Sequence, residues 1–211
     1  MITGLCRSQG HSKSISLFLN DKFAFKLEAE VVLKEGLQVG QELSVQQVEA
    51  LKKKDLYQKC LDTALRYLDY RPRSEYEVIQ RLMERGFNDN DIKGVLDYLK
   101  KQGFLDDSSF AKFWKDSRQS FKPRSRRLTE IELRQKGVSM EIIEMEVSTI
   151  DDTENAYRAA ANRSRNLASI DYKGFYRRLG EFLKRRGFGY EVINTTIIRL
   201  WQEREGDRID D

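Results

Sequence analysis

Pro72–Phe87 reads PRSEYEVIQRLMERGF, and the skeleton of this stretch returns twice along the chain. Pro123–Val138 reads PRSRRLTEIELRQKGV, and Lys173–Phe188 reads KGFYRRLGEFLKRRGF. Each copy has a glycine as its penultimate residue, and successive glycines lie 51 and 50 residues apart. A spacing of this length indicates a structural unit that is repeated three times.

The residues around each glycine predict helices. A leucine stands four positions before each glycine, and aliphatic residues stand six and ten positions after it. In the first copy, Ser74 and Glu77 have the spacing of a capping box, and Gly86 suits the left-handed position that ends a helix. Leu128 replaces the capping-box glutamate in the second copy, so that cap is expected to be weaker. Asp171 precedes the corresponding helix of the third copy.

The fold class that follows is mainly α, with tandem three-helix repeats in an elongated array and a small strand-containing N-terminal segment. In that segment Asn20-Asp21 has the composition of a hairpin turn, and a short helix is expected to close at Gly36. Ser44 and Gln47 then predict a capped helix start. The expected divisions are residues 1–43 for the strand-containing segment, 44–105, 106–150 and 151–204 for the repeats, and 205–211 for a polar tail.

The net charge of +4 conceals two basic blocks. Residues 1–107 are neutral overall, whereas residues 108–140 have net charge +6 and residues 158–187 have net charge +7. Residues 141–157 and 188–211 are acidic, at −6 and −3. Each basic block contains the middle helix of a repeat, which favours a polyanion or an acidic protein surface as partner. A solvated helix face with no partner is the alternative for either block.

Eleven cations in these blocks are the candidate contact residues for a protein partner or DNA. They are Lys122, Arg124, Arg126, Arg127, Arg134, Lys136, Arg177, Arg178, Lys184, Arg185 and Arg186. Seven-residue spacings, such as Arg127 to Arg134 and Arg177 to Lys184, place side chains on one helix face. Guanidinium groups arranged in this way suit phosphates and carboxylates.

Aromatic residues flank the repeated turn. Tyr70, Phe121 and Tyr172 could stack on nucleic-acid bases. Packing into the core is the alternative that we expect for them.

Catalytic and metal sites have little support in the sequence. His11 is the only histidine, and Cys6 and Cys60 lack the spacing of a zinc site, so free thiols are expected. Asp106-Asp107 and Asp151-Asp152 precede helices, where N-capping is expected rather than metal binding. Glycine patterns of nucleotide-binding loops are absent, so no cofactor is expected and we predict that the protein is not an enzyme. No 18-residue apolar run and no signal-peptide pattern occur, which predicts a cytoplasmic, membrane-free protein.

Three stretches resemble the RecX family of bacterial regulators of the RecA recombinase. They are ALRYLDYRPRSEYEVIQRLMERGF, VLDYLKKQGFLDDSSFAKFW and EIELRQKGV, and the resemblance extends over residues 57–200. It implies tandem three-helix repeats in a curved molecule and a monomer that binds the RecA nucleoprotein filament in DNA repair and recombination. It also implies restraint of filament growth, ATP hydrolysis and strand exchange. Direct contact with single- or double-stranded DNA is secondary in this reading. A stand-alone DNA-binding module with helix-turn-helix-like repeats is the alternative.

Overall fold

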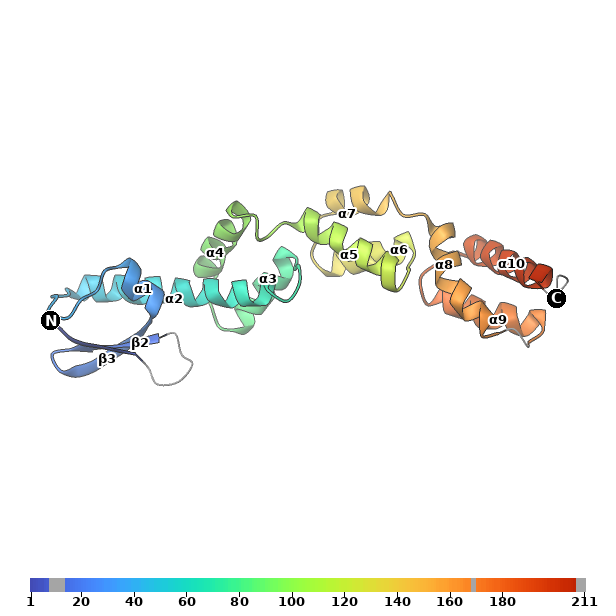
Figure 1. Cartoon of the computed structure of the whole chain (residues 1–211). Helices are drawn as coiled ribbons and strands as arrows, with labels where there is room; N and C mark the ends of the chain where they lie inside the picture. The colour runs from blue at the N-terminus through green and yellow to red at the C-terminus, as the bar shows by residue number, and fades with distance from the viewer. Residues whose placement is uncertain (8–13, 168–169, 208–211) are drawn as a thin grey trace. The chain divides into compact units, whose positions relative to one another are not determined.

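The computed structural model describes residues 1–7, 14–167 and 170–207, and it is mainly helical (Figure 1). The strands are β1 (Ile2–Arg7), β2 (Ser14–Leu19) and β3 (Lys22–Glu28). The helices are α1 (Ala29–Lys34), α2 (Val45–Leu68), α3 (Glu75–Glu84), α4 (Asp89–Lys101), α5 (Asp107–Phe121), α6 (Arg126–Gln135), α7 (Met140–Val147), α8 (Asp152–Arg165), α9 (Tyr172–Lys184) and α10 (Tyr190–Asp207). None of the helices in these described ranges combines the length and apolarity that a membrane span requires.

The chain forms two compact units. The first consists of residues 1–71 and 78–105, and the second of residues 72–77 and 106–211. The first unit therefore holds the sheet, α1, α2, α4 and most of α3. The second holds α5 to α10 together with the first turn of α3.

The N-terminal segment is an antiparallel sheet with strand order β1-β2-β3. Asn20 and Asp21 join β2 to β3 with φ values of 49° and 62°, which is the left-handed geometry of a tight hairpin turn and confirms that prediction. The sheet shares a core with α1 and α2, formed by Ile2, Leu17, Leu27, Val31, Val32, Leu37 and Leu51. The short helix expected before Gly36 is α1.

Each set of three helices has its own apolar core, as the repeat pattern predicts. In the first set, α2, α3 and α4 bury Cys60, Ala64, Val78, Leu82 and Leu99. The second set is α5 to α7, which buries Phe110, Leu133, Val138, Ile143 and Val147. In the third set, α8 to α10 bury Ala160, Phe175, Leu179, Leu183 and Ile197.

Caps and glycines delimit the middle helices. Ser74 Oγ accepts the N–H of Glu77 at 3.2 Å, and Glu77 accepts the N–H of Ser74 at 3.4 Å, which confirms the capping box of α3. Ser44 and Gln47 form a second box at the start of α2. Gly86, Gly137 and Gly187 all have left-handed φ values, between 75° and 84°, because each reverses the chain where a middle helix ends.

Helix α9 begins at Tyr172, directly after Asp171, which confirms Asp171 as the expected N-cap. It starts four residues earlier than the alignment with Pro123–Val138 alone implies, because α6 begins at Arg126. Two further details concern helix ends. Ser139, a residue type that favours helix capping, occupies the N-cap position of α7 but makes no side-chain cap hydrogen bond. Helix α10 continues to Asp207, so the first residues of the predicted polar tail, 205–207, are helical, and residues 208–211 lie outside the described residues.

The flanking aromatic residues do not pack into the core as a group. Tyr70 is 86% exposed and Phe121 is 83% exposed, so the prediction of core packing is wrong for both. Tyr172 is 43% exposed and lies edge-on against Trp201, with ring centroids 5.1 Å apart. The error arises because position beside a turn does not determine whether a side chain points inward or outward.

Candidate interaction surface of the second and third repeats

The first turn of α6 is tied to the third repeat. Asp152, at the start of α8, accepts the backbone N–H of Arg126 at 2.7 Å, and the N–H of Ser125 donates to the carbonyl of Arg186 at 3.0 Å. In a capping box, a glutamate at the position of Leu128 would accept the Ser125 N–H. Here the carbonyl of Arg186 accepts it instead, while Ser125 Oγ still accepts the N–H of Leu128. These contacts hold α6 against the end of α9 and so bring the two basic blocks together.

The carboxylate of Glu132 on α6 organises a cluster of cations. It accepts hydrogen bonds from Trp114 Nε1 and Arg118 Nε, each at 2.9 Å, and it forms an ion pair with Arg124. The Arg118 guanidinium also lies 4.3 Å from the centroid of the Trp114 ring. One acid therefore positions two arginines, and the indole face adds a cation–π contact.

Further arginines continue this cluster into the third repeat. The guanidinium carbons of Arg186 and Arg163 lie 4.2 Å and 4.9 Å from the centroid of the Phe182 ring. Burial lowers the pKa of Arg186, and the charges of Arg163 and Arg185 add to this effect. Burial likewise lowers the pKa of Arg124, with smaller contributions from Arg118 and Arg186. Burial is thus the main cause of both lower pKa values, and the contributions of neighbouring cations show that the guanidinium groups of the two repeats lie close together.

Five of the eleven predicted contact residues have structural partners. Arg124 pairs with Glu132, and Lys136 pairs with Glu77 at 2.6 Å. Arg126 donates to the carbonyls of Ser148 and Ile150 at 3.2 Å and 3.0 Å. The remaining two are Arg134, which pairs with Glu130 at 3.0 Å, and Arg186, which stacks on Phe182.

The other six predicted residues are exposed and make no ion pair with any residue that the structure describes. They are Lys122, Arg127, Arg177, Arg178, Lys184 and Arg185. Four of them lie on α9 or at its C-cap, where the spacing of seven aligns Arg177 with Lys184 and Arg178 with Arg185. Glu181 is the single acidic residue of α9. We call these four cations the α9 basic face. Their role in binding stays a prediction.

Sequence reasoning missed Arg118 and Arg163. Both belong to the first helices of their repeats, α5 and α8, whereas the predicted contact residues lie on or beside the middle helices. Both lie within the two basic blocks, so the net positive charge of those blocks is the sequence feature that could have identified them. Only the fold places Arg118 beside Arg124 and Arg163 beside Arg186.

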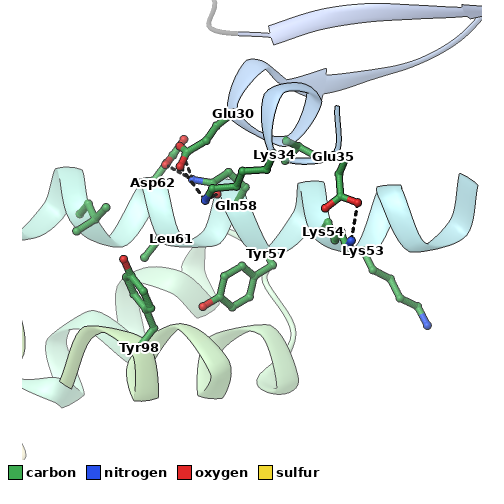
Figure 2. A pocket seen from close by; sticks show the side chains of 12 residues that line it. Glu30, Lys34, Glu35, Lys53, Lys54, Tyr57, Gln58, Leu61, Asp62 and Tyr98 are labelled. Carbon is green, nitrogen blue, oxygen red and sulfur yellow. Dashed lines mark hydrogen bonds and ion pairs between the residues drawn. The ribbon is translucent and has the colours of Figure 1, made fainter. Parts of the chain in front are cut away.

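A cavity of about 490 Å³ in the first unit lies between α1, α2 and α4 (Figure 2). Figure 2 shows Tyr57 and Tyr98 on one side of α2, while Glu30 and Lys34 of α1 reach it from the other. The rim is internally paired, since Lys34 binds Glu30 at 2.8 Å and Lys54 binds Glu35 at 2.6 Å. Paired charges of this kind present little net attraction to an ionic ligand.

The paired aspartates serve as helix caps, as predicted. Asp106 accepts the N–H groups of Ser108 and Ser109, at 3.1 Å and 3.0 Å, and hydrogen bonds from Ser109 lower the pKa of its carboxyl. Asp151 caps α8 in the same manner. Across residues 1–7, 14–167 and 170–207, no group of three or more His, Cys, Asp or Glu side chains could hold a metal ion. His11 lies outside the described residues.

Two family models match the chain. The first three-helix domain of RecX matches residues 60–99, and the second matches residues 106–145. The chain is 32% identical over 203 residues to the regulatory protein RecX of Clostridium botulinum strain Alaska E43, covering 93% of this chain and 94% of that protein. It is 26% identical to the regulatory protein RecX of Clostridium tetani, covering 94% of each.

Solved structures share the fold. A crystal structure of regulatory protein RecX superposes with a TM-score of 0.67 at 21% identity, covering 92% of this chain and 97% of that one. RecX from Lactobacillus salivarius superposes with a TM-score of 0.60, also at 21% identity, covering 70% of this chain and 97% of that one. The expectation of tandem three-helix domains is thereby confirmed.

Proposed function

The chain belongs to the RecX family, and from this premise we propose that it regulates the RecA recombinase, mainly as an inhibitor. It would act in the cytoplasm as a monomer by binding the RecA–DNA filament. The observation that carries this proposal is the α9 basic face, which is exposed, has no ion-pair partner among the described residues and belongs to the same unit as the arginine cluster around Glu132. A nucleoprotein filament offers phosphates and acidic side chains together, and both are ligands for guanidinium groups.

The cations fall into two groups, one held in place by Glu132 and one exposed on α9, and we expect the two groups to act differently in binding. Arg118 and Arg124 are held in place by Glu132, so they provide a fixed positive field without losing much side-chain entropy on binding. Arg177 and Arg185 are exposed and extend toward solvent, so they can pair directly with anionic groups of a partner. Charge of this kind accelerates association and makes binding sensitive to salt.

Binding along the filament would restrain its growth, its ATP hydrolysis and strand exchange. The test is to add the protein to RecA assembled on single-stranded DNA and to follow ATP hydrolysis. The proposal expects the rate to fall as the protein approaches stoichiometric amounts with RecA. An unchanged rate at stoichiometric amounts would overturn it.

A stand-alone DNA-binding module is the alternative function, because three-helix units with a basic helix are found in helix-turn-helix proteins. Tight, sequence-selective binding to duplex DNA without RecA would favour this alternative. Duplex binding that is weak, sequence-independent and steeply dependent on salt would instead fit the proposed regulator, since it reflects phosphate contacts alone.

A further inference from the structure

A second pocket, lined by basic side chains, lies on the first repeat, where the end of α2 meets the end of α3. Its volume is about 330 Å³, and it is lined by Thr63, Arg66, Tyr67, Tyr70, Arg81 and Arg85. All of these residues belong to the first unit. Three arginines and two tyrosines thus line this pocket, and none of the residues that line it is acidic. Charge counting along the sequence missed this pocket because residues 1–107 are neutral overall.

The arginines of the pocket retain most of their donors. Arg66 is exposed and uses Nε to bind the carbonyl of Asp62 at 3.1 Å. Arg85 is exposed and makes no ion pair with a residue in the described part of the chain. Arg81 reaches Glu84 at 3.5 Å, a long contact with a carboxylate that is 66% exposed. Exposed contacts of this kind contribute little and can be exchanged for a phosphate.

The tyrosines add aromatic faces to this charge. The Arg81 guanidinium carbon lies 5.7 Å from the centroid of the Tyr67 ring. Tyr70, one turn further along the chain, is 86% exposed, although a large aromatic ring on a protein surface loses favourable burial. Exposed rings next to guanidinium groups are the combination that binds the bases and backbone of an unpaired strand.

We propose that this pocket is a binding site for single-stranded DNA, in which Arg66, Arg81 and Arg85 contact phosphates and Tyr70 stacks on a base. A duplex would satisfy the arginines but would leave Tyr70 unused, because its bases are stacked on one another. An acidic peptide would likewise lack a base for the ring. The site is separate from the α9 basic face, and its test omits RecA, so the two proposals fail independently.

The test measures fluorescence anisotropy of a labelled oligothymidylate over a range of salt concentrations. Arg66→Gln, Arg81→Gln and Arg85→Gln together should reduce the slope of log K against log salt by about 2, since each lost phosphate contact on a single strand removes about 0.7. The matched control is Lys53→Gln, Lys93→Gln and Lys101→Gln, which removes three exposed charges from the same unit outside this pocket. The control should change the slope by less than half as much.

A second variant isolates the contribution of stacking. Tyr70→Ala should weaken binding at least about fivefold, the lower end of the range for one stacked base, whereas Tyr70→Phe should bind normally. On an oligonucleotide of abasic sites, Tyr70→Ala and the unaltered protein should bind equally. Circular dichroism should be unchanged, because Tyr70 lies on the surface.

Three outcomes would overturn the proposal. One is an equal effect of the arginine and lysine triples, and another is normal binding by Tyr70→Ala. The third is tighter binding of a duplex of the same length than of the single strand.

Discussion

The carboxylate of Asp152 lies 2.7 Å from the backbone nitrogen of Arg126 and caps a helix of the preceding repeat. The same relationship joins Asp107 to the nitrogen of Glu75 at 2.8 Å. In each aspartate pair the first residue caps its own helix and the second caps the middle helix of the repeat before it. The pairs therefore connect repeats as well as start helices.

Removing this connection should destabilise the second unit. Asp152→Ala leaves the N–H of Arg126 without its acceptor, and loss of a helix cap costs about 1 kcal/mol. Urea unfolding monitored by circular dichroism measures the change in free energy. Asp116→Ala provides the control, because Asp116 is an exposed aspartate in the interior of α5. Equal stability of the two variants would contradict a capping role for Asp152.

Glycine positions should differ in their tolerance of alanine. Gly86 and Gly187 have φ values of 82° and 84°. Alanine at either position should therefore lower the free energy of unfolding by about 1–2 kcal/mol, because a Cβ disfavours the left-handed conformation. At Gly187 a Cβ would also lie 2.6 Å from Ser125 Oγ and 2.7 Å from Leu128 Cβ, whereas at Gly86 it would meet nothing within 4 Å. Gly187→Ala should therefore lose about 1–3 kcal/mol more than Gly86→Ala, as for other overpacked sites. Thermal or urea unfolding compares the two, and equal losses would show that the repeat junction is not tightly packed.

Two glutamates on α6 should contribute very differently to stability. Glu132 holds Trp114, Arg118 and Arg124, and its side chain is 11% exposed. Glu132→Ala should cost about 3 kcal/mol, because it leaves partly buried arginines without their shared carboxylate. Glu130→Ala removes one surface pair with Arg134 and should cost less than about 1 kcal/mol. Chemical denaturation measures both, and the account fails here if Glu130→Ala is the more damaging change.

The two cysteines should differ in reactivity. Cys6 is exposed, whereas Cys60 is buried and its burial raises the pKa of the thiol from 9.0 to about 11. At pH 8 about one Cys60 thiol in a thousand would be ionised, compared with about one in ten at the ordinary pKa, and the thiolate is the reactive form. A disulfide reagent should therefore label one thiol rapidly and the second only on unfolding.

Cys6→Ser identifies the rapidly labelled thiol, because it should abolish the fast phase. Because the folded pKa of Cys60 is raised, the stabilising effect of its neutral burial is complete below pH 9 and is lost as pH rises toward 11. Rapid labelling that persists in Cys6→Ser would contradict burial of Cys60.

Much of the fold could be predicted because its signals are local. Ser74 and Glu77 identify a helix start, and Gly86 identifies a helix end, from backbone chemistry that acts within a few residues. The candidate surface was harder to predict. Arg124 and Arg127 look equivalent in the sequence, yet Arg124 is held by a carboxylate eight residues away and Arg127 is exposed. The exposure of Tyr70 also depends on tertiary packing, which a single sequence does not specify.

The central claim is that the α9 basic face contacts the RecA filament. Its most direct test compares the unaltered protein with a variant carrying Arg177→Glu, Arg178→Glu, Lys184→Glu and Arg185→Glu. A variant with Lys53→Glu, Lys93→Glu, Lys101→Glu and Lys112→Glu has the same net charge and serves as control, because these lysines are exposed on other helices.

The decisive measurement is the rate of ATP hydrolysis by RecA on single-stranded DNA as each protein is titrated. The account predicts that the unaltered protein and the lysine control inhibit at similar concentrations, whereas the α9 variant needs at least about tenfold more protein. Equal inhibition by the α9 variant and the unaltered protein would contradict the claim.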